Sequence, residues 1–265
     1  MRAPQRHAAV AAALFFLTSL AACGSGGDGS AGFGGGGVLE EEGRIDQSSD
    51  PEWWLSSGAL FFRSGDSART IQGDLPPDSP WRGAYSRSNS RDSAGGARPQ
   101  NLFRLVHRRS FANLDQQVSF LVQRTDASSS PNRNASNGVF LFQRYLGEND
   151  LYASGVRVDG AAAIKKKSGG RTHTLASRPL FGNGAPYDRG ANPNVLPPGR
   201  WIHLRTEALD DPQGVRLRLF VDGTLAVETI DDGRGAEGPL LGSGLAGVRG
   251  DFMDLELRGY AAEAR

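Results

Sequence analysis

The chain has 265 residues, with 30 Lys and Arg against 29 Asp and Glu, so its formal net charge is +1. This balance gives no overall field that would attract a nucleic acid, and we expect no nucleic-acid partner. A single cysteine excludes an intramolecular disulfide and any zinc site built on several cysteines. With 36 Gly and 14 Pro, the chain is rich in turn formers but stays below the level typical of disorder throughout.

Residues 1–22 have the pattern of a secretory signal peptide. Arg2 and Arg6 supply the positively charged start, and residues 8–20 supply a mostly apolar stretch of 13 residues. That stretch is too short to span a bilayer as a stable helix. We therefore expect residues 1–22 to be a targeting segment that is not part of the folded domain.

The signal peptide ends in Leu20-Ala21-Ala22-Cys23, which resembles the lipobox of bacterial lipoproteins. The resemblance implies cleavage before Cys23, lipidation of that cysteine with palmitate, and attachment to a membrane through the lipid alone. Gly24 follows the cysteine, and by the same resemblance this favours the outer membrane of the cell envelope, on its periplasmic or surface face. The alternative is an ordinary signal peptide with a chance cysteine.

Residues 24–37 (GSGGDGSAGFGGGG) offer almost no side chains to bury, which is typical of a flexible tether. We predict that residues 23–50 hold the lipidated cysteine and this linker. Residues 51–265 are then predicted to form one folded domain, with no sign of a second.

Short apolar segments with an alternating pattern follow from residue 53, and none carries a helical period over three turns. In residues 215–221 (VRLRLFV), for example, Val215, Leu217 and Leu219 share one face. Asp159-Gly160 and Asp222-Gly223 are hairpin signals, because Gly tolerates the positive φ of tight turns. The predicted strands are residues 102–106, 117–123, 138–145, 151–159, 201–205, 215–221, 224–230, 245–249 and 253–260. This pattern predicts an all-β sandwich or jelly roll.

Two long segments lack a strand pattern. Residues 125–137 are polar, and residues 177–200 contain five prolines. Long loops on a β scaffold are frequent binding sites, and the alternative is that they only connect strands at the surface.

Four motifs carry a resemblance to a known fold family: GVFLFQRYLGENDLYASGVRVDG at residues 138–160, PGRW at 198–201, RLRLFVDG at 216–223 and GLAGVRGDFMDLELRGY at 244–260. In order and spacing they resemble the concanavalin A-like jelly rolls of bacterial extracellular proteins, including laminin G-like and keto-glycoside hydrolase-like domains. The resemblance implies an all-β, concanavalin A-like jelly-roll sandwich of two antiparallel sheets. Its motifs are mostly turns and core positions, so they indicate fold better than function.

The strongest local charge feature is Lys165-Lys166-Lys167. On a strand, Lys165 and Lys167 share one face, and Arg144 and Arg157 are candidates to lie near them on adjacent strands. One interpretation is a cationic strip that binds uronic-acid or sulfated sugars. The other is an edge strand whose lysines block pairing with further chains.

The remaining candidate carbohydrate-binding residues are Arg104, Tyr145, Tyr152 and His173. Jelly-roll polysaccharide lyases neutralise a uronate with Arg or Gln and use His or Tyr as base or acid. No lyase motif is present, however, and strand alternation separates Gln143 and Tyr145 from Arg144. The E-x-D-x-x-E string of laminarinase-like glycosidases is also absent. Catalytic residues are therefore left unassigned.

Asp251 and Asp254 are candidate ligands of a structural Ca²⁺ ion, which jelly rolls of this type often carry near the last strand. Asp231 and Asp232 are a second acidic pair, for which turn capping is the competing interpretation.

Together these patterns predict a lipid-anchored, extracytoplasmic domain that binds a glycan without catalysing its cleavage. Acidic polysaccharide is a candidate ligand, and the membrane is a partner through the N-terminal lipid. One alternative is a polysaccharide lyase or glycoside hydrolase on the same scaffold. Another is a cell-envelope module that contacts other proteins.

Overall fold

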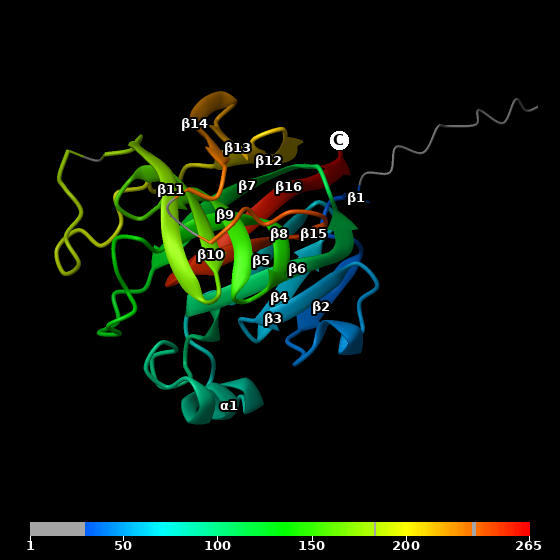
Figure 1. Ribbon diagram of the computed structural model, residues 1–265. Helices are drawn as coiled ribbons and strands as arrows, with labels where there is room; N and C mark the ends of the chain where they lie inside the picture. The colour runs from blue at the N-terminus through cyan, green and yellow to red at the C-terminus, as the bar shows by residue number, and fades with distance from the viewer. Residues whose placement is uncertain (1–29, 183, 235–236) are drawn as a thin grey trace, which may run out of the picture.

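The computed structural model describes residues 30–182, 184–234 and 237–265. Within them the chain forms two antiparallel sheets that pack face to face across one main hydrophobic core (Figure 1). This is the all-β jelly-roll sandwich that the sequence predicts. The predicted signal peptide and Cys23 lie outside the described residues. Among the described helices, none is long and apolar enough to cross a membrane.

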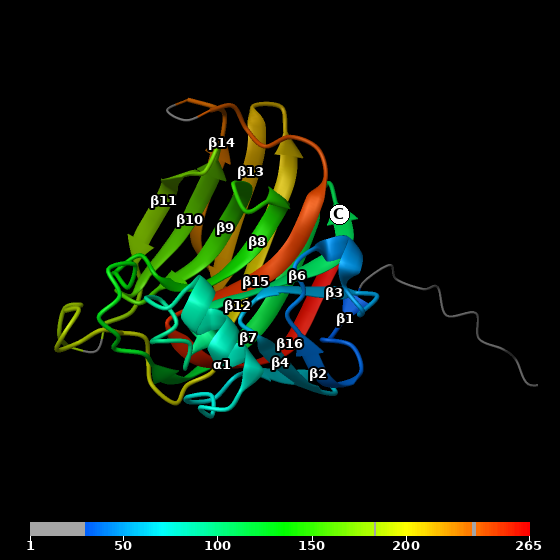
Figure 2. The same ribbon diagram turned by 90° about the horizontal axis from the view of Figure 1, so that it is seen from below.

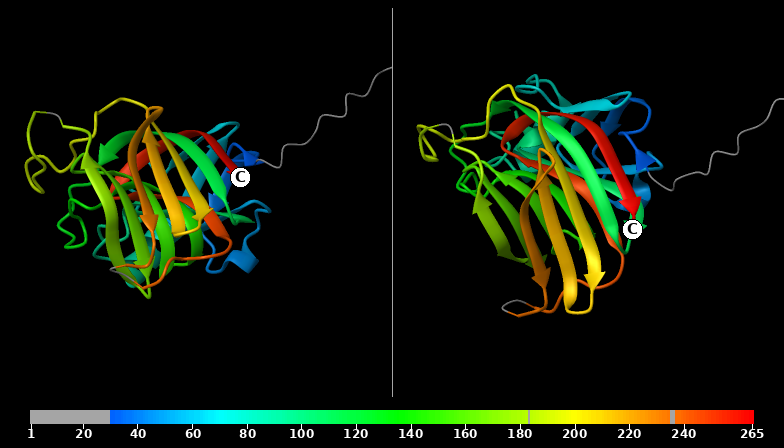
Figure 3. Two further views of the ribbon diagram at one scale, coloured as in Figure 1. Left: turned by 45° about the horizontal axis from the view of Figure 1, so that its top comes forward. Right: turned by 90° about the horizontal axis from the view of Figure 1, so that it is seen from above.

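One sheet has nine strands. Its order is β14 (Thr224–Asp231), β13 (Gly214–Val221), β12 (Ile202–Asp211), β7 (Leu114–Thr125), β16 (Met253–Ala264), β5 (Ser67–Thr70), β4 (Leu60–Ser64) and β2 (Gly36–Glu40), and β1 (Ser30–Ala31) also pairs with β16. Figure 3 shows β12 to β14, in yellow to orange, beside β7 in green and β16 in red.

The other sheet has seven strands, and Figure 2 looks onto its outer face. Its order is β11 (Arg171–Pro179), β10 (Ala161–Ser168), β9 (Asp150–Arg157), β8 (Gly138–Gly147), β15 (Gly244–Asp251), β6 (Leu102–Phe111) and β3 (Trp53–Ser57). Strands from distant parts of the sequence, such as β8 and β15, are therefore neighbours.

Residues of the predicted strands form the core. The side chains of Phe120, Val139, Leu141 and Leu219 are fully buried, and Val221 is nearly so. Because each sheet buries one face, a period of two decides which side chains point inward. The predicted Asp222-Gly223 turn joins β13 to β14, with φ angles of 49° and 79° that match a tight hairpin.

The folded domain begins earlier than the predicted boundary at residue 51. β1 and β2 lie inside the segment that was expected to be a linker, and they pair with β16 and β4. Phe33 is fully buried, with its ring centroid 5.7 Å from that of Trp53 and 5.4 Å from that of Phe61. Glycines can join a strand ladder without leaving a side-chain pattern, so this pairing was not predictable from the residue pattern.

The described residues include one short α-helix, α1 (Pro80–Ser88), which the strand-only prediction did not contain. It has nine residues, too few for a helical period over three turns. It lies outside the sandwich, at one end of the seven-stranded sheet (Figures 1 and 2). Two short 3₁₀ helices, η1 (Ile45–Gln47) and η2 (Pro99–Asn101), complete the elements.

Candidate functional site

A groove of about 580 Å³ lies on the outer face of the seven-stranded sheet. Small residues lower its floor, because Gly247 of β15 and Ala153 of β9 flank Phe142 of β8 in one cross-strand row. The next residue in this row is Lys165 of β10. A single row across four strands therefore combines an apolar floor with a cation.

Four basic side chains line the groove: Arg104, Lys165, Lys167 and Arg249. Arg104 of β6 stands directly opposite Arg249 of β15, and Lys165 and Lys167 share one face of β10. β10 is flanked on both sides, by β9 and β11. The lysines therefore do not lie on an edge strand, and the interpretation that they block pairing with further chains is wrong.

Lys165 is held over the groove floor. Its Nζ lies 4.2 Å from the ring centroid of Phe140 and donates a hydrogen bond to the carbonyl oxygen of Ser136 at 2.6 Å. Burial lowers the pKa of Lys165 to about 8; the positive charges of Arg249 and Arg157 act in the same direction, while Asp251 acts against them. This ammonium group is poised to lose its charge just above neutral pH.

Three carboxylates also line the groove, and each is engaged within the protein. Asp251 accepts a hydrogen bond from Nε of Arg249 at 2.7 Å, and Asp92 accepts two from Nδ2 of Asn132, at 3.0 and 3.1 Å. Glu148 Oε2 lies 3.7 Å from Nη1 of Arg104.

Aromatic rings form the floor rather than exposed platforms. Phe142 and Tyr145 stack with centroids 5.5 Å apart and an interplanar angle of 27°. Tyr145 is only 5% exposed, and burial raises its pKa. Any ligand in the groove therefore meets mainly cationic and polar groups above an apolar base.

The loop at residues 126–137 lies at one end of the groove. Its Asn132, Asn134 and Ser136 are exposed side chains that line the groove. The second predicted loop braces the first, since Arg133 Nη1 donates to the carbonyl of Arg189 at 2.8 Å. Thr172 and Thr174 of β11 add hydroxyl groups along the side of the groove next to the two lysines.

Arg144 was expected near the lysines, but it points into the sandwich. It has a left-handed φ of 47° at a register shift in β8, between Gln143 and Gly147. This bulge breaks the alternation, so Arg144 shares the inner side with Gln143 while Tyr145 faces the groove. The Arg144 guanidinium donates to the carbonyl of Leu240 at 2.8 Å and to Oδ1 of Asp210 at 2.7 Å.

Tyr152 and His173 are also placed away from the groove. Tyr152 is fully buried between the sheets, donates to Oδ2 of Asp231 at 2.6 Å, and has a pKa raised by burial. His173 stands opposite Lys166 and so shares the inner side of the sheet. Arg157 is on the groove side of β9, at its end, where it is paired with Asp159. The groove therefore unites Arg104, Tyr145, Lys165 and Lys167 of the predicted site residues.

Arg249 is the groove cation that the sequence analysis missed. Its strand was predicted, but only as a core element of the fold. The pattern Ala246-Gly247-Val248-Arg249 could have indicated it. On a strand, Gly247 and Arg249 share one face, so a cation stands beside a position that has no side chain.

The predicted calcium ligands do not fit a cation site. Asp254 accepts from Nη2 of Arg98 at 2.6 Å, from Nε2 of Gln100 at 2.9 Å and from the backbone N–H of Gly73 at 2.9 Å. Asp251 is bound to Arg249 in the groove, on a different sheet. Both oxygens of Asp254 are thus taken by donors within the protein, and the two aspartates lie on different sheets. No group of three or more potential metal ligands occurs among the described residues.

Comparisons with known proteins give similarity in solved structures only. No family model matches the sequence, and no curated protein matches it. The chain is similar to the carbohydrate-binding module CBM66 from Bacillus subtilis, with 12% identity, 80% of this chain and 94% of that chain covered, and a TM-score of 0.49. It is also similar to a Bacillus subtilis protein of unknown function with a galectin-like fold (12% identity, 85% and 92% covered, TM-score 0.44). The acidic lectin of winged bean, solved with methyl-α-D-galactose, is 9% identical over 89% of this chain and 98% of the lectin, with a TM-score of 0.46.

Proposed function

We propose that this domain binds an acidic glycan in the groove of its seven-stranded sheet. The observation that carries the proposal is the set of four cations, Arg104, Lys165, Lys167 and Arg249, on one hollowed face. Guanidinium groups match the planar carboxylate of a uronic acid, and ammonium groups add compact point charges. The exposed amides and hydroxyls of the groove walls suit sugar hydroxyls.

The proposed activity is binding without turnover. A glycoside hydrolase would need two carboxylates that face the scissile bond. Asp251 and Asp92, which line the groove, accept hydrogen bonds from Arg249 and Asn132 instead. These contacts support recognition of the glycan rather than its hydrolysis.

We further propose that the domain works in the cell envelope, held by a lipid on Cys23. The motif at residues 20–23 supports this proposal. Replacing Cys23 with Ser should stop the incorporation of a palmitate analogue in cells. Labelling that persists in this variant would refute the anchor without affecting the groove.

The test of glycan binding uses the chain from residue 24 onward, which retains every described strand. Pectate, alginate and a neutral glucan are titrated at 0.1 M and 1 M salt, where the Debye length falls from about 10 Å to about 3 Å. We expect the acidic polymers to bind at low salt and to be released at high salt. The double variant Lys165→Ala with Lys167→Ala should lose most of this binding.

A matched control removes two exposed charges elsewhere, through Arg44→Ala with Arg234→Ala; neither residue lines the groove. Equal binding of acidic and neutral polymers, unaffected by salt or by the lysine variants, would refute the proposal. Assays for new reducing ends and for unsaturated uronates run in parallel. Turnover in either would assign the groove to an enzyme instead.

A further inference from the structure

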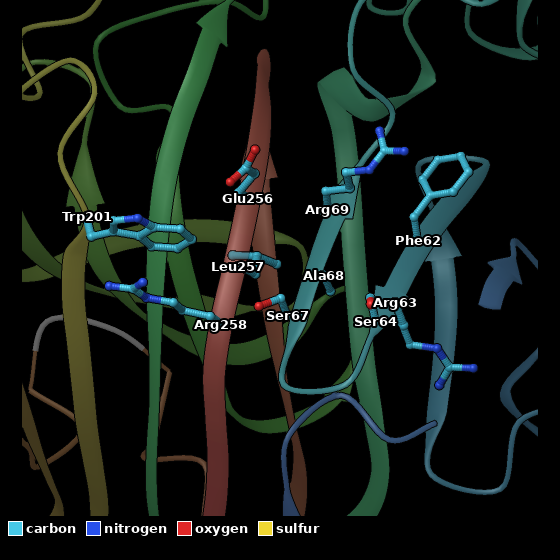
Figure 4. Close-up of a pocket in the computed structure, with 10 residues that line it drawn as sticks. All are labelled: Phe62, Arg63, Ser64, Ser67, Ala68, Arg69, Trp201, Glu256, Leu257 and Arg258. Carbon is cyan, nitrogen blue, oxygen red and sulfur yellow. The ribbon is translucent and has the colours of Figure 1, made fainter. Parts of the chain in front are cut away.

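A second pocket, of about 390 Å³, lies on the outer face of the nine-stranded sheet. It spans β16, β5 and β4, with Trp201 just before β12 at its other side (Figure 4). It is separate from the groove, because it belongs to the opposite sheet and shares no lining residue with it.

Two arginines in this pocket are stacked on aromatic rings. The guanidinium carbon of Arg258 lies 4.0 Å from the ring centroid of Trp201, and that of Arg69 lies 4.7 Å from the centroid of Phe62. Figure 4 shows the Arg258 side chain extended beneath the Trp201 ring, with Arg69 and Phe62 on the other side of the pocket. Stacking holds each guanidinium by its face and leaves its N–H edge free to donate.

These two arginines differ from their neighbours on the same sheet. Arg205, Arg216 and Arg218 are each paired with Asp or Glu side chains at 3.3 Å or less. Among the described residues, neither Arg69 nor Arg258 has a hydrogen bond or an ion pair from its guanidinium. Both side chains are exposed. These three arginines are neutralised within the sheet, whereas Arg69 and Arg258 are open to an external anion.

Polar groups that suit a sugar line the same pocket as the two arginines. Glu256 stands opposite Arg69 in the strand register, and its Oε1 accepts one hydrogen bond, from Nε2 of Gln123 at 2.8 Å. Its carboxylate keeps further acceptor positions for ligand hydroxyls. Ser64 and Ser67 pair across β4 and β5 in the floor and add two exposed hydroxyl groups. The half-buried Trp201 and Phe62 rings supply apolar surface at the two sides.

We infer that this pocket is a second binding site for a sugar residue that bears a carboxylate. The arginine edges take the carboxylate, Glu256 and the serines take hydroxyls, and the aromatic rings contact the apolar face of the sugar. The identity of the ligand rests on the proposed function, which supplies the class of glycan. Because the two sites lie on opposite sheets, one domain can hold two chains of an acidic polymer at once and cross-bridge them.

The test titrates the chain from residue 24 onward with trigalacturonate, and with uncharged galactotriose as the ligand control. The indole N–H signal of Trp201, assigned by Trp201→Phe, reports the outer pocket in a ¹⁵N-resolved NMR spectrum. Calorimetry gives the stoichiometry. The outer-pocket variant is Arg69→Gln with Arg258→Gln, the groove variant is Lys165→Ala with Lys167→Ala, and the control is Arg44→Gln with Arg234→Gln.

We expect two trigalacturonates per wild-type chain, a shift of the Trp201 signal, and no response to galactotriose. Each site variant should bind one ligand, with affinity at the altered site reduced at least roughly tenfold. Only the wild type and the control should turn pectate solutions turbid by cross-bridging. Thermal unfolding of each variant establishes that it is folded.

The possible failures are distinguishable. One ligand per chain, lost in the groove variant with no shift of Trp201, would overturn the second site and leave the groove proposal standing. One ligand lost only in the Arg69 and Arg258 variant would overturn the groove proposal and support the outer pocket. No binding of trigalacturonate at millimolar concentration would overturn both.

Discussion

The ammonium group of Lys166 lies 2.9 Å from Oδ2 of Asp231, and both side chains are shielded from solvent between the two sheets. Lys166 belongs to β10 and Asp231 ends β14, so the pair ties one sheet to the other. Lys166 also donates to the carbonyl of Gly238 at 2.8 Å, and Tyr152 donates to the same Asp231 oxygen. These buried polar groups thus hold Gly238, in the segment after β14, against one end of the sandwich.

Replacing Lys166 with Met should lower the free energy of unfolding by about 3–5 kcal/mol, because Asp231 would be left as an uncompensated buried charge. Lys167→Met is the matched control, since the same chemical change in the partly exposed groove residue should cost under about 1 kcal/mol. Urea unfolding measures both. The double variant Lys166→Met with Asp231→Leu should recover part of the loss; full additivity of the two single changes would contradict a direct pairing.

Binding of acidic glycan should weaken as the pH rises through about 8. Lys165 is charged below its pKa of about 8 and neutral above it, so its attraction to a carboxylate is present at pH 6.5 and lost by pH 9.5. A bound carboxylate favours the ammonium form, which places the midpoint of the loss somewhat above 8. We expect affinity for trigalacturonate to fall roughly fivefold across this range, as measured by calorimetry.

Lys165→Arg is the control for that pH dependence, because a guanidinium keeps its charge over the whole range. The chain has only three lysines, so their Cε signals are readily followed by NMR, with assignment by single substitution. A Lys165 signal that titrates near 10.5, the ordinary lysine value, together with a flat affinity profile, would show that burial does not tune this group.

Arg144 should matter for stability rather than for direct glycan contact. Arg144→Ala removes a buried charge-assisted hydrogen bond to the Leu240 carbonyl and should cost about 2–4 kcal/mol of unfolding free energy. Asp210→Asn should cost under about 1 kcal/mol, because the Asp210 side chain is 57% exposed. Amide exchange should accelerate around residues 238–241 in Arg144→Ala. Unchanged exchange there would mean that Arg144 does not hold this segment.

The sandwich was predictable because both sheets bury one face. In β13, where burial alternates residue by residue, the pattern therefore indicated core residues such as Leu217 and Leu219 from the sequence alone. The Asp222-Gly223 hairpin was predictable for a local reason, the positive φ angles of its turn. Both features depend on residues that are close together in the sequence, so one sequence is enough to predict them.

The composition of the groove was only partly predictable, because it depends on strand order. Arg104 and Arg249 meet because β6 and β15 pair, although 145 positions separate them. Arg144 was misplaced for a different reason: its φ of 47° reverses the alternation of β8, and nothing in an arginine signals a left-handed backbone. A one-residue bulge was enough to exchange the faces of Arg144 and Tyr145.

Asp251 offers a decisive test of what the groove recognises. Its carboxylate lies 2.7 Å from Nε of Arg249 and therefore competes with a ligand carboxylate for that guanidinium. Asp251→Asn keeps an acceptor oxygen near the backbone N–H of Gly138 but removes the negative charge. At pH 6, where Lys165 is protonated, trigalacturonate should bind roughly two- to fivefold more tightly to this variant, with a steeper dependence on salt. A role as a calcium ligand predicts the reverse, a loss of binding that a chelator reproduces in the wild type. Titrations of both proteins with and without a chelator separate the two, and weaker binding in Asp251→Asn would contradict the competition between Asp251 and the glycan for Arg249.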